Sequence, residues 1–125
     1  MAIPSELQYT EEHEWVRMEG DIAIVGMTEH GQEEFSDVAF VELPEIGRVV
    51  EEKEACAMVE SVNGTSDIYA PVSGEIVEIN TTLEEEPGNI NEAPYGDGWL
   101  FKVRVTDMEI VEGLLTADDY EEHLG

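Results

Sequence analysis

The apolar positions of this chain fall into many short runs that alternate with polar residues, and turn-forming residues separate the runs. Alternation with a period of two predicts β-strands with one buried face. It occurs over Glu14–Met18 and Ile22–Met27, on either side of Gly20-Asp21, and predicts a hairpin there. The later runs that predict strands are Val38–Leu43, Arg48–Val50, Cys56–Ser61, Ser66–Tyr69, Gly74–Ile79 and Trp99–Val105.

Helix signals are fewer and short. Thr28 has the side chain of a helix N-cap and predicts a helix that ends at Phe35. Asp107 predicts a second cap, and Thr116 opens a last helix in capping-box style. The apolar faces expected of these last two helices are Met108, Val111, Leu114 and Leu115, then Tyr120 and Leu124. The polar stretch Thr81–Tyr95 predicts a long loop, and strict alternation in Trp99–Val105 places Leu100 opposite Phe101.

The pair Asn63-Gly64 is the strongest hairpin signal in the chain. Both residues accept positive φ, so the pair predicts a two-residue type I′ turn between strands near Cys56–Val62 and Thr65–Tyr69. The same residues also read as an N-x-T glycosylation acceptor or as a deamidation-prone turn. As a hairpin tip, the turn would present one side chain well clear of the sheet.

The composition adds strong acidity to this picture. Asp and Glu number 31 against 5 Lys and Arg, which gives a formal net charge of −26. Such a charge repels phosphate backbones and anionic bilayers, so we expect no nucleic-acid and no membrane partner. Because 42% of the 125 residues are hydrophobic, we expect one packed domain over residues 1–125, with the scarcity of Lys as one indication of a halophilic host.

Cysteine usage and the N-terminal sequence bear on the compartment. A single cysteine, Cys56, fits a reducing environment. The first residues lack the basic and apolar segments of a secretory signal, and no apolar run approaches the ~20 residues of a membrane helix. We expect a cytoplasmic protein, or a mitochondrial-matrix protein if the chain is a processed eukaryotic form.

Few residues carry a specific chemical signal. His13, His30 and His123 lie far apart in the sequence, so surface histidines and a site shared with carboxylates both stay open, and no metal site is predicted. His13-Glu14-Trp15 sets an imidazole and an acid beside a large aromatic side chain. It predicts either a strand with an inward Trp or a small acid–base site.

Several segments, in order along nearly the whole chain, resemble the glycine cleavage system H protein family. The central one, Val59–Ile76, resembles the family's lipoyl-attachment segment. The resemblance implies a mainly β barrel-sandwich hybrid, lipoyl-domain-like, with two antiparallel sheets and short helices, including C-terminal ones. The other segments that carry it are Tyr9–Val16, Val25–Glu33, Phe40–Gly47, Pro94–Leu100 and Leu114–Leu124.

The resemblance implies a carrier rather than an enzyme. In the family, a lipoyl-lysine at the hairpin tip takes an aminomethyl group from glycine decarboxylase (P protein) to aminomethyltransferase (T protein). Dihydrolipoyl dehydrogenase then reoxidises the lipoyl arm. A lipoate ligase or lipoyl transferase is the enzyme that attaches the arm to the protein. The loaded arm rests in a cleft. The positions that match the family's tip and cleft are Glu60, Asn63, Asp67, Glu14 and His30.

The main departure from the family is Asn63, which stands where the lipoyl-lysine is expected. An amide nitrogen is not a nucleophile toward an activated lipoyl group, whereas a deprotonated lysine amine is. We therefore expect no covalently attached lipoate on the chain as written. Three hypotheses remain: an H-type carrier by descent, a non-lipoylated module or anchor-null variant that binds the same partners, and a small enzyme using His13 and Glu14.

Overall fold

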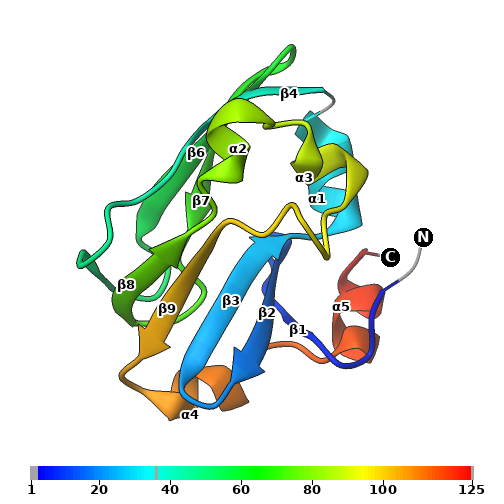
Figure 1. The fold of residues 1–125 in the computed structure, drawn as a ribbon. Helices are drawn as coiled ribbons and strands as arrows, with labels where there is room; N and C mark the ends of the chain where they lie inside the picture. Colours follow the sequence, from blue (N-terminus) through cyan, green and yellow to red (C-terminus); the bar gives the residue numbers. More distant parts are fainter. Residues whose placement is uncertain (1–2, 36, 125) are drawn as a thin grey trace.

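The computed structural model describes residues 3–35 and 37–124, which form nine strands and five short helices in the order shown in Figure 1. The strands are β1 Gln8–Tyr9, β2 Glu14–Glu19, β3 Ile22–Met27, β4 Val38–Glu42, β5 Val49–Val50, β6 Ala55–Ser61, β7 Gly64–Tyr69, β8 Gly74–Ile79 and β9 Phe101–Val105. The helices are α1 Glu29–Phe35, α2 Thr82–Glu85, α3 Asn89–Glu92, α4 Met108–Glu112 and α5 Ala117–Leu124.

The strands form two antiparallel sheets. The larger sheet has the order β1-β2-β3-β9-β8-β5, and the smaller one has the order β4-β6-β7. The expected mainly β architecture with two antiparallel sheets and short helices is confirmed, and the sheets do not close into a barrel. In Figure 1 the β6–β7 hairpin rises at the top of the molecule, α4 lies at the bottom, and α5 lies beside β1.

The main hydrophobic core lies between the two sheets, where the inward residues of each alternate with outward polar ones. Cys56 is part of this core, and burial raises the pKa of its thiol to about 12. Such a buried thiol is unreactive at neutral pH. The larger members are Val16, Val25, Val59, Ile68, Ile76, Leu83, Ile90, Leu100, Phe101 and Val103.

A second, smaller core lies where α5 and the N-terminal segment cover part of the larger sheet. Tyr120 of α5 stacks on Tyr9 with ring centroids 4.7 Å apart and an interplanar angle of 7°. Trp15 completes this cluster and donates its indole N–H to the carbonyl of Pro94 at 2.8 Å. The strand prediction for Trp15, with its ring turned inward, is confirmed.

The helix caps follow the sequence signals. The Thr28 hydroxyl accepts the amide of Gly31 at 3.1 Å, the Asp107 carboxylate accepts that of Glu109 at 3.0 Å, and the Thr116 hydroxyl accepts that of Asp119 at 3.2 Å. Each cap satisfies an amide that a helix leaves without an internal partner.

Three local predictions are wrong. The stretch Thr81–Tyr95 is not a loop throughout, because it contains α2 and α3, whose apolar residues Leu83 and Ile90 are fully buried. Leu100 is also fully buried, because the regular strand begins only at Phe101 and strict alternation does not extend to it. The apolar face expected of the helix after Asp107 is also wrong. Helix α4 ends before Gly113, so Leu114 and Leu115 lie beyond it. Met108, which was expected on the buried face, is 46% exposed.

Candidate functional site

The β6–β7 hairpin presents the first candidate region. Its strands pair from Ala55 with Tyr69 to Ser61 with Gly64, and Val62 and Asn63 connect them. The Ser61 hydroxyl accepts the amide of Asn63 at 3.2 Å and braces the tip. The side chains of Val62 and Asn63 are exposed, with Val62 at 76%. The predicted hairpin with a presented tip is confirmed.

The turn itself differs from the prediction by one residue. The two connecting residues are Val62 and Asn63, not Asn63 and Gly64, since Gly64 already pairs with Ser61. Of the two residues predicted to have positive φ, only Gly64 has it, at +120°. A type I′ turn needs positive φ at both central residues, whereas a bulge after an ordinary turn needs it only at the following glycine. At the tip, positive φ is therefore confined to Gly64.

Two of the predicted site residues share the outer face of this hairpin. Glu60 pairs with Thr65, and Asp67 pairs with Met58, so the two acids lie diagonally across the strands on one side. Both are exposed. They leave the tip flanked by negative charge, with no Lys or Arg between Glu54 and Phe101 in the sequence.

A cleft of about 400 Å³ opens where β7 ends. Its walls come from the start of the chain, the turn before β6, the end of β7 and the segment between α4 and α5. Tyr69 lines it, six extended residues from Asn63, or roughly 20 Å along the strand. The lining residues are Tyr9, Thr10, Glu11, Glu12, Glu14, Glu52, Lys53, Tyr69, Ala70, Pro71, Gly113, Leu114 and Leu115.

Glu14 is the buried acid of this cleft. Its side chain is only 2% exposed, and its carboxylate accepts the hydroxyl of Thr10 at 2.7 Å and the backbone N–H of Tyr69. Burial raises the pKa of Glu14 to about 7, and these two hydrogen bonds only partly offset it. The carboxyl therefore changes charge near neutral pH.

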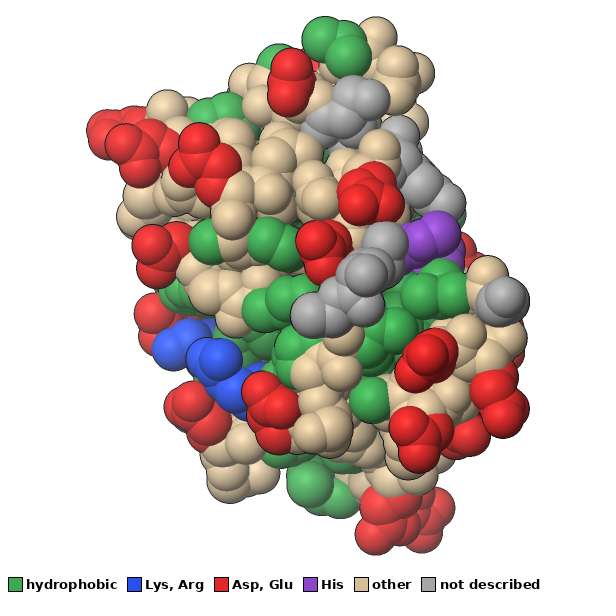
Figure 2. Space-filling model, turned by 90° about the vertical axis from the view of Figure 1, so that its right-hand side faces the viewer, with side chains coloured by type: hydrophobic (Ala, Val, Ile, Leu, Met, Phe, Trp, Pro, Cys, Tyr) green, Lys and Arg blue, Asp and Glu red, His purple; other side chains and the backbone are tan. Residues whose placement is uncertain are grey.

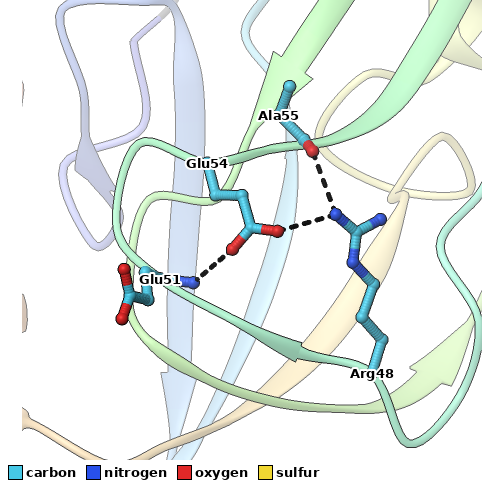
Figure 3. A network of polar contacts seen from close by, with 4 residues as sticks. All are labelled: Arg48, Glu51, Glu54 and Ala55. Carbon is cyan, nitrogen blue, oxygen red and sulfur yellow. Dashed lines mark hydrogen bonds and ion pairs between the residues drawn. The ribbon is translucent and has the colours of Figure 1, made fainter.

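A hydrogen-bonded turn over residues 51–54 forms one rim of the cleft through Glu52 and Lys53. Figure 3 shows the contacts that hold this turn. The guanidinium of Arg48 donates to the Glu54 carboxylate at 2.7 Å and to the Ala55 carbonyl at 3.2 Å. The other oxygen of Glu54 accepts the amide of Glu51 at 3.0 Å. The hydrogen bond from the Arg48 guanidinium lowers the pKa of Glu54.

Lys53 stands in this rim turn with a φ of +71°. This left-handed backbone suits glycine better than lysine, since a Cβ atom there is strained. Two backbone bonds hold the turn against the end of β7: Lys53 donates to the Ala70 carbonyl and Ala70 to the Glu54 carbonyl, both at 2.8 Å.

The three histidines come together although they are distant in the sequence. The His13 ring lies 4.6 Å from that of His30 on α1 and 6.1 Å from that of His123 on α5, centroid to centroid. Histidine side chains reach the surface together on the face shown in Figure 2. Within residues 3–35 and 37–124, no group of three or more His, Cys, Asp or Glu side chains is arranged to hold a metal ion.

His30, predicted from the family's cleft, does not line the cleft that contains Glu14. It lies on α1 against His13, on the other side of the turn that precedes Glu14. The cleft partners that sequence reasoning missed are Thr10 and Tyr69. Both residues lie in segments that carry the resemblance, but nothing in their type marks them as partners of Glu14, and only the fold brings Tyr69 to it.

An amide-linked lipoyl group needs a lysine, and the tip does not supply one. The two lysines of the chain are Lys53 and Lys102. Lys102 lies within β9, 3.3 Å from the Glu78 carboxylate and 5.1 Å from the centroid of the Trp99 ring. Lys53 lies in the rim turn, near the opposite end of the hairpin from Asn63. The tip therefore does not fit a covalently held lipoyl group.

A hairpin tip that presents the side chains of Val62 and Asn63, together with a cleft at the base of the hairpin in a two-sheet sandwich, is typical of a carrier-type domain. Comparison with known proteins specifies which kind. The family model described as "Glycine cleavage H-protein" matches residues 7–125.

Relatives and a solved structure agree over the whole chain. The glycine cleavage system H protein of one Thermus thermophilus strain is 52% identical over 124 residues, covering 99% of this chain and 97% of that protein. The H protein of Staphylococcus carnosus is 50% identical over 125 residues, covering 100% and 99%. The crystal structure of an H protein from Mycobacterium marinum superposes with a TM-score of 0.88 at 40% identity, covering 98% and 99%.

The chain therefore belongs to the glycine cleavage H-protein family. Proteins of this family are lipoyl carriers that work with the P and T proteins of the glycine cleavage system, and they are not catalysts. This excludes the small-enzyme hypothesis built on His13 and Glu14. In the part of the chain that the structure describes, no helix is long and apolar enough to cross a bilayer.

Proposed function

We propose that this chain is an H-type protein of the glycine cleavage system that keeps the docking surface and the cleft of a carrier but lacks the lipoyl anchor at its hairpin tip. The observation that carries the proposal is Asn63, an exposed amide at the tip of an otherwise family-like hairpin. An amide does not form the linkage that a lysine amine forms, so the chain as written carries no lipoyl group.

The cleft supports the carrier part of the proposal. It pairs apolar walls, from Leu114, Leu115 and Pro71, with one buried acid, Glu14. That combination suits a flexible alkyl arm that ends in a polar or cationic group, because the walls cover the chain and the acid accepts its hydrogen bond. Glu60 and Asp67 beside the tip, and Glu14 in the cleft, are the site residues that we assign to this function.

The alternative is a module that binds the P protein, the T protein or a lipoate ligase without carrying cargo. Both functions predict that partner proteins bind the hairpin face. They differ in whether Asn63→Lys restores a chain that carries lipoate and cargo. Docking is therefore tested first, by measuring how the unmodified chain competes with a lipoylated relative for purified P protein.

We expect competition, and we expect Asp67→Lys beside the tip to weaken it at least several-fold. The matched control is Glu109→Lys, which makes the same charge reversal on α4 at the opposite end of the molecule (Figure 1) and should leave competition unchanged. Equal loss from both reversals, or no competition by the parent chain, contradicts docking through the hairpin.

A further inference from the structure

The residue just before the cleft acid has an unusual backbone conformation. His13 has a φ of +71°, in the left-handed region, and Glu14 follows it directly. A left-handed conformation is strained for a non-glycine residue, because its Cβ atom comes too close to the backbone. Such a conformation persists only where surrounding contacts hold it. The contacts around His13 therefore decide where the next side chain points.

The hydroxyl of Tyr120 provides the central contact. It lies 2.8 Å from Nδ1 of His13 and 2.7 Å from Oγ1 of Thr28, so one phenol from α5 joins the His13 turn to the start of α1. The amide of Thr28 in turn donates to the His13 carbonyl at 2.9 Å. Tyr120 is fully buried, and its ring is fixed by stacking on Tyr9.

Helix α1 closes the other side of the turn. A Cβ atom built on Gly31 would lie 3.0 Å from the Cβ of His13 and 3.2 Å from its carbonyl oxygen. The helix backbone thus approaches the His13 turn as closely as a glycine allows. The turn is held between α1 and α5, which come from distant parts of the chain.

The segment that leads into α5 also forms part of the cleft wall. Tyr9 and Leu115 exchange two backbone hydrogen bonds of 2.9 Å and 2.8 Å, and both residues line the cleft. The cleft wall at Tyr9 and Leu115 therefore continues directly into α5, which contacts the His13 turn.

We propose that Tyr120 is a positioning residue for the cleft: through His13 it holds the turn that keeps the Glu14 carboxyl inside, so that α5 acts as a clamp on the carrier's internal site. The inference depends on the proposed function only in taking Glu14 as the acid that receives the cargo.

The test is a carboxyl-carbon NMR titration of Glu14 in the unmodified chain, which needs no lipoate and no partner. Tyr120→Phe removes one oxygen and keeps the ring. With the clamp released, the Glu14 carboxyl regains water, and its pKa should fall from about 7. We expect a fall of roughly one unit or more, because desolvation is what raised the pKa.

Tyr95→Phe is the matched control. The Tyr95 hydroxyl also binds the start of α1, accepting the amide of Glu29 at 3.1 Å, and Tyr95 does not line the cleft. We expect this variant to lose a similar hydrogen bond and to leave the Glu14 titration unchanged. A folded Tyr120→Phe variant with the parent titration, or equal shifts in both variants, overturns the proposal.

If Tyr120→Phe does not fold, His13→Ala provides the second route. It removes the imidazole that contacts Tyr120 but keeps the Cβ atom, so the strained positive φ loses the contact that holds it. The Glu14 pKa should fall as predicted for Tyr120→Phe, and an unchanged value contradicts the clamp. Lipoylation and partner binding are measured separately, so failure of the carrier proposal leaves this result interpretable.

Discussion

The protonation of Glu14 depends on packing that its neighbours in the sequence do not reveal. Burial by itself disfavours the carboxylate, whereas the Thr10 hydroxyl and the Tyr69 amide favour it, and burial is the larger effect. The sequence predicted that this residue belongs to a cleft because a family resemblance marked it. Its partner Tyr69 is 55 positions away (69 − 14), so no local pattern connects the two.

The raised pKa makes stability depend on pH. The folded value of about 7 lies above the ordinary 4.5, so between these values the folded state binds more protons than the unfolded state. The free energy of unfolding should therefore fall as pH rises from 5 to 8, by on the order of 2–3 kcal/mol from this group. Glu14→Gln, which does not titrate, should remove that part of the decline.

The measurement is urea unfolding at both pH values in high salt, which suppresses general charge repulsion. Glu85→Gln, on the exposed surface of α2, is the control and should follow the parent. If Glu14→Gln lost as much stability as the parent between pH 5 and 8, the assignment of this pH dependence to Glu14 would be wrong.

At the scale of elements, the sequence predicted the strands better than the connections. The hairpins β2–β3 and β6–β7 were expected from alternation around short turns, and both formed. The tip turn shifted by one residue because Asn63 does not take the positive φ of a type I′ turn and Gly64 does. The helices α2 and α3 were missed because each is four residues long and is defined by one buried side chain rather than a period.

The rim turn gives a prediction about backbone strain. Lys53→Gly should raise the free energy of unfolding by about 1 kcal/mol, because glycine adopts the φ of +71° without the clash of a Cβ atom. Lys53→Ala removes the same charge and alkyl chain but keeps Cβ, so it should give no such gain. Thermal and urea unfolding of the two variants separate strain from charge, and equal effects would contradict the role of strain.

At the scale of the whole molecule, the sheet order was not predictable from local patterns. Strand β9 pairs with β3, and Tyr9 pairs with Leu115, so these contacts join residues 76 to 106 positions apart only in the folded chain. Resemblance to a family supplied the architecture that periodicity could not. The three histidines also lie far apart in the sequence, and only the folded chain brings their rings together.

Charge is the other property of the whole molecule. The net charge is −26, and Figure 2 shows acidic side chains spread over one face while Lys and Arg side chains gather in a single group. Four basic residues already have a carboxylate within 4 Å; the pairs are Arg17–Glu19, Arg48–Glu54, Lys102–Glu78 and Arg104–Glu75. The field that a partner meets is thus strongly negative.

Association with the P or T protein should therefore be steered by charge. We expect the association rate to fall at least tenfold between low and high salt, while the dissociation rate changes less. Stopped-flow or surface-plasmon measurements over a KCl series test this, with an uncharged osmolyte at equal osmolality as the control. An association rate that is independent of ionic strength would remove the steering argument.

We propose that the hairpin is intact and its anchor is absent, and a lipoylation assay examines both parts of this proposal. The parent chain and Asn63→Lys are each incubated with lipoate ligase, ATP and lipoate, and their intact masses are compared. We expect no mass gain on the parent and one lipoyl group on Asn63→Lys, since Glu60, Asp67 and the tight tip remain to present the new amine. A lipoyl group on the parent chain, or a well-folded Asn63→Lys variant that stays unmodified, would contradict it.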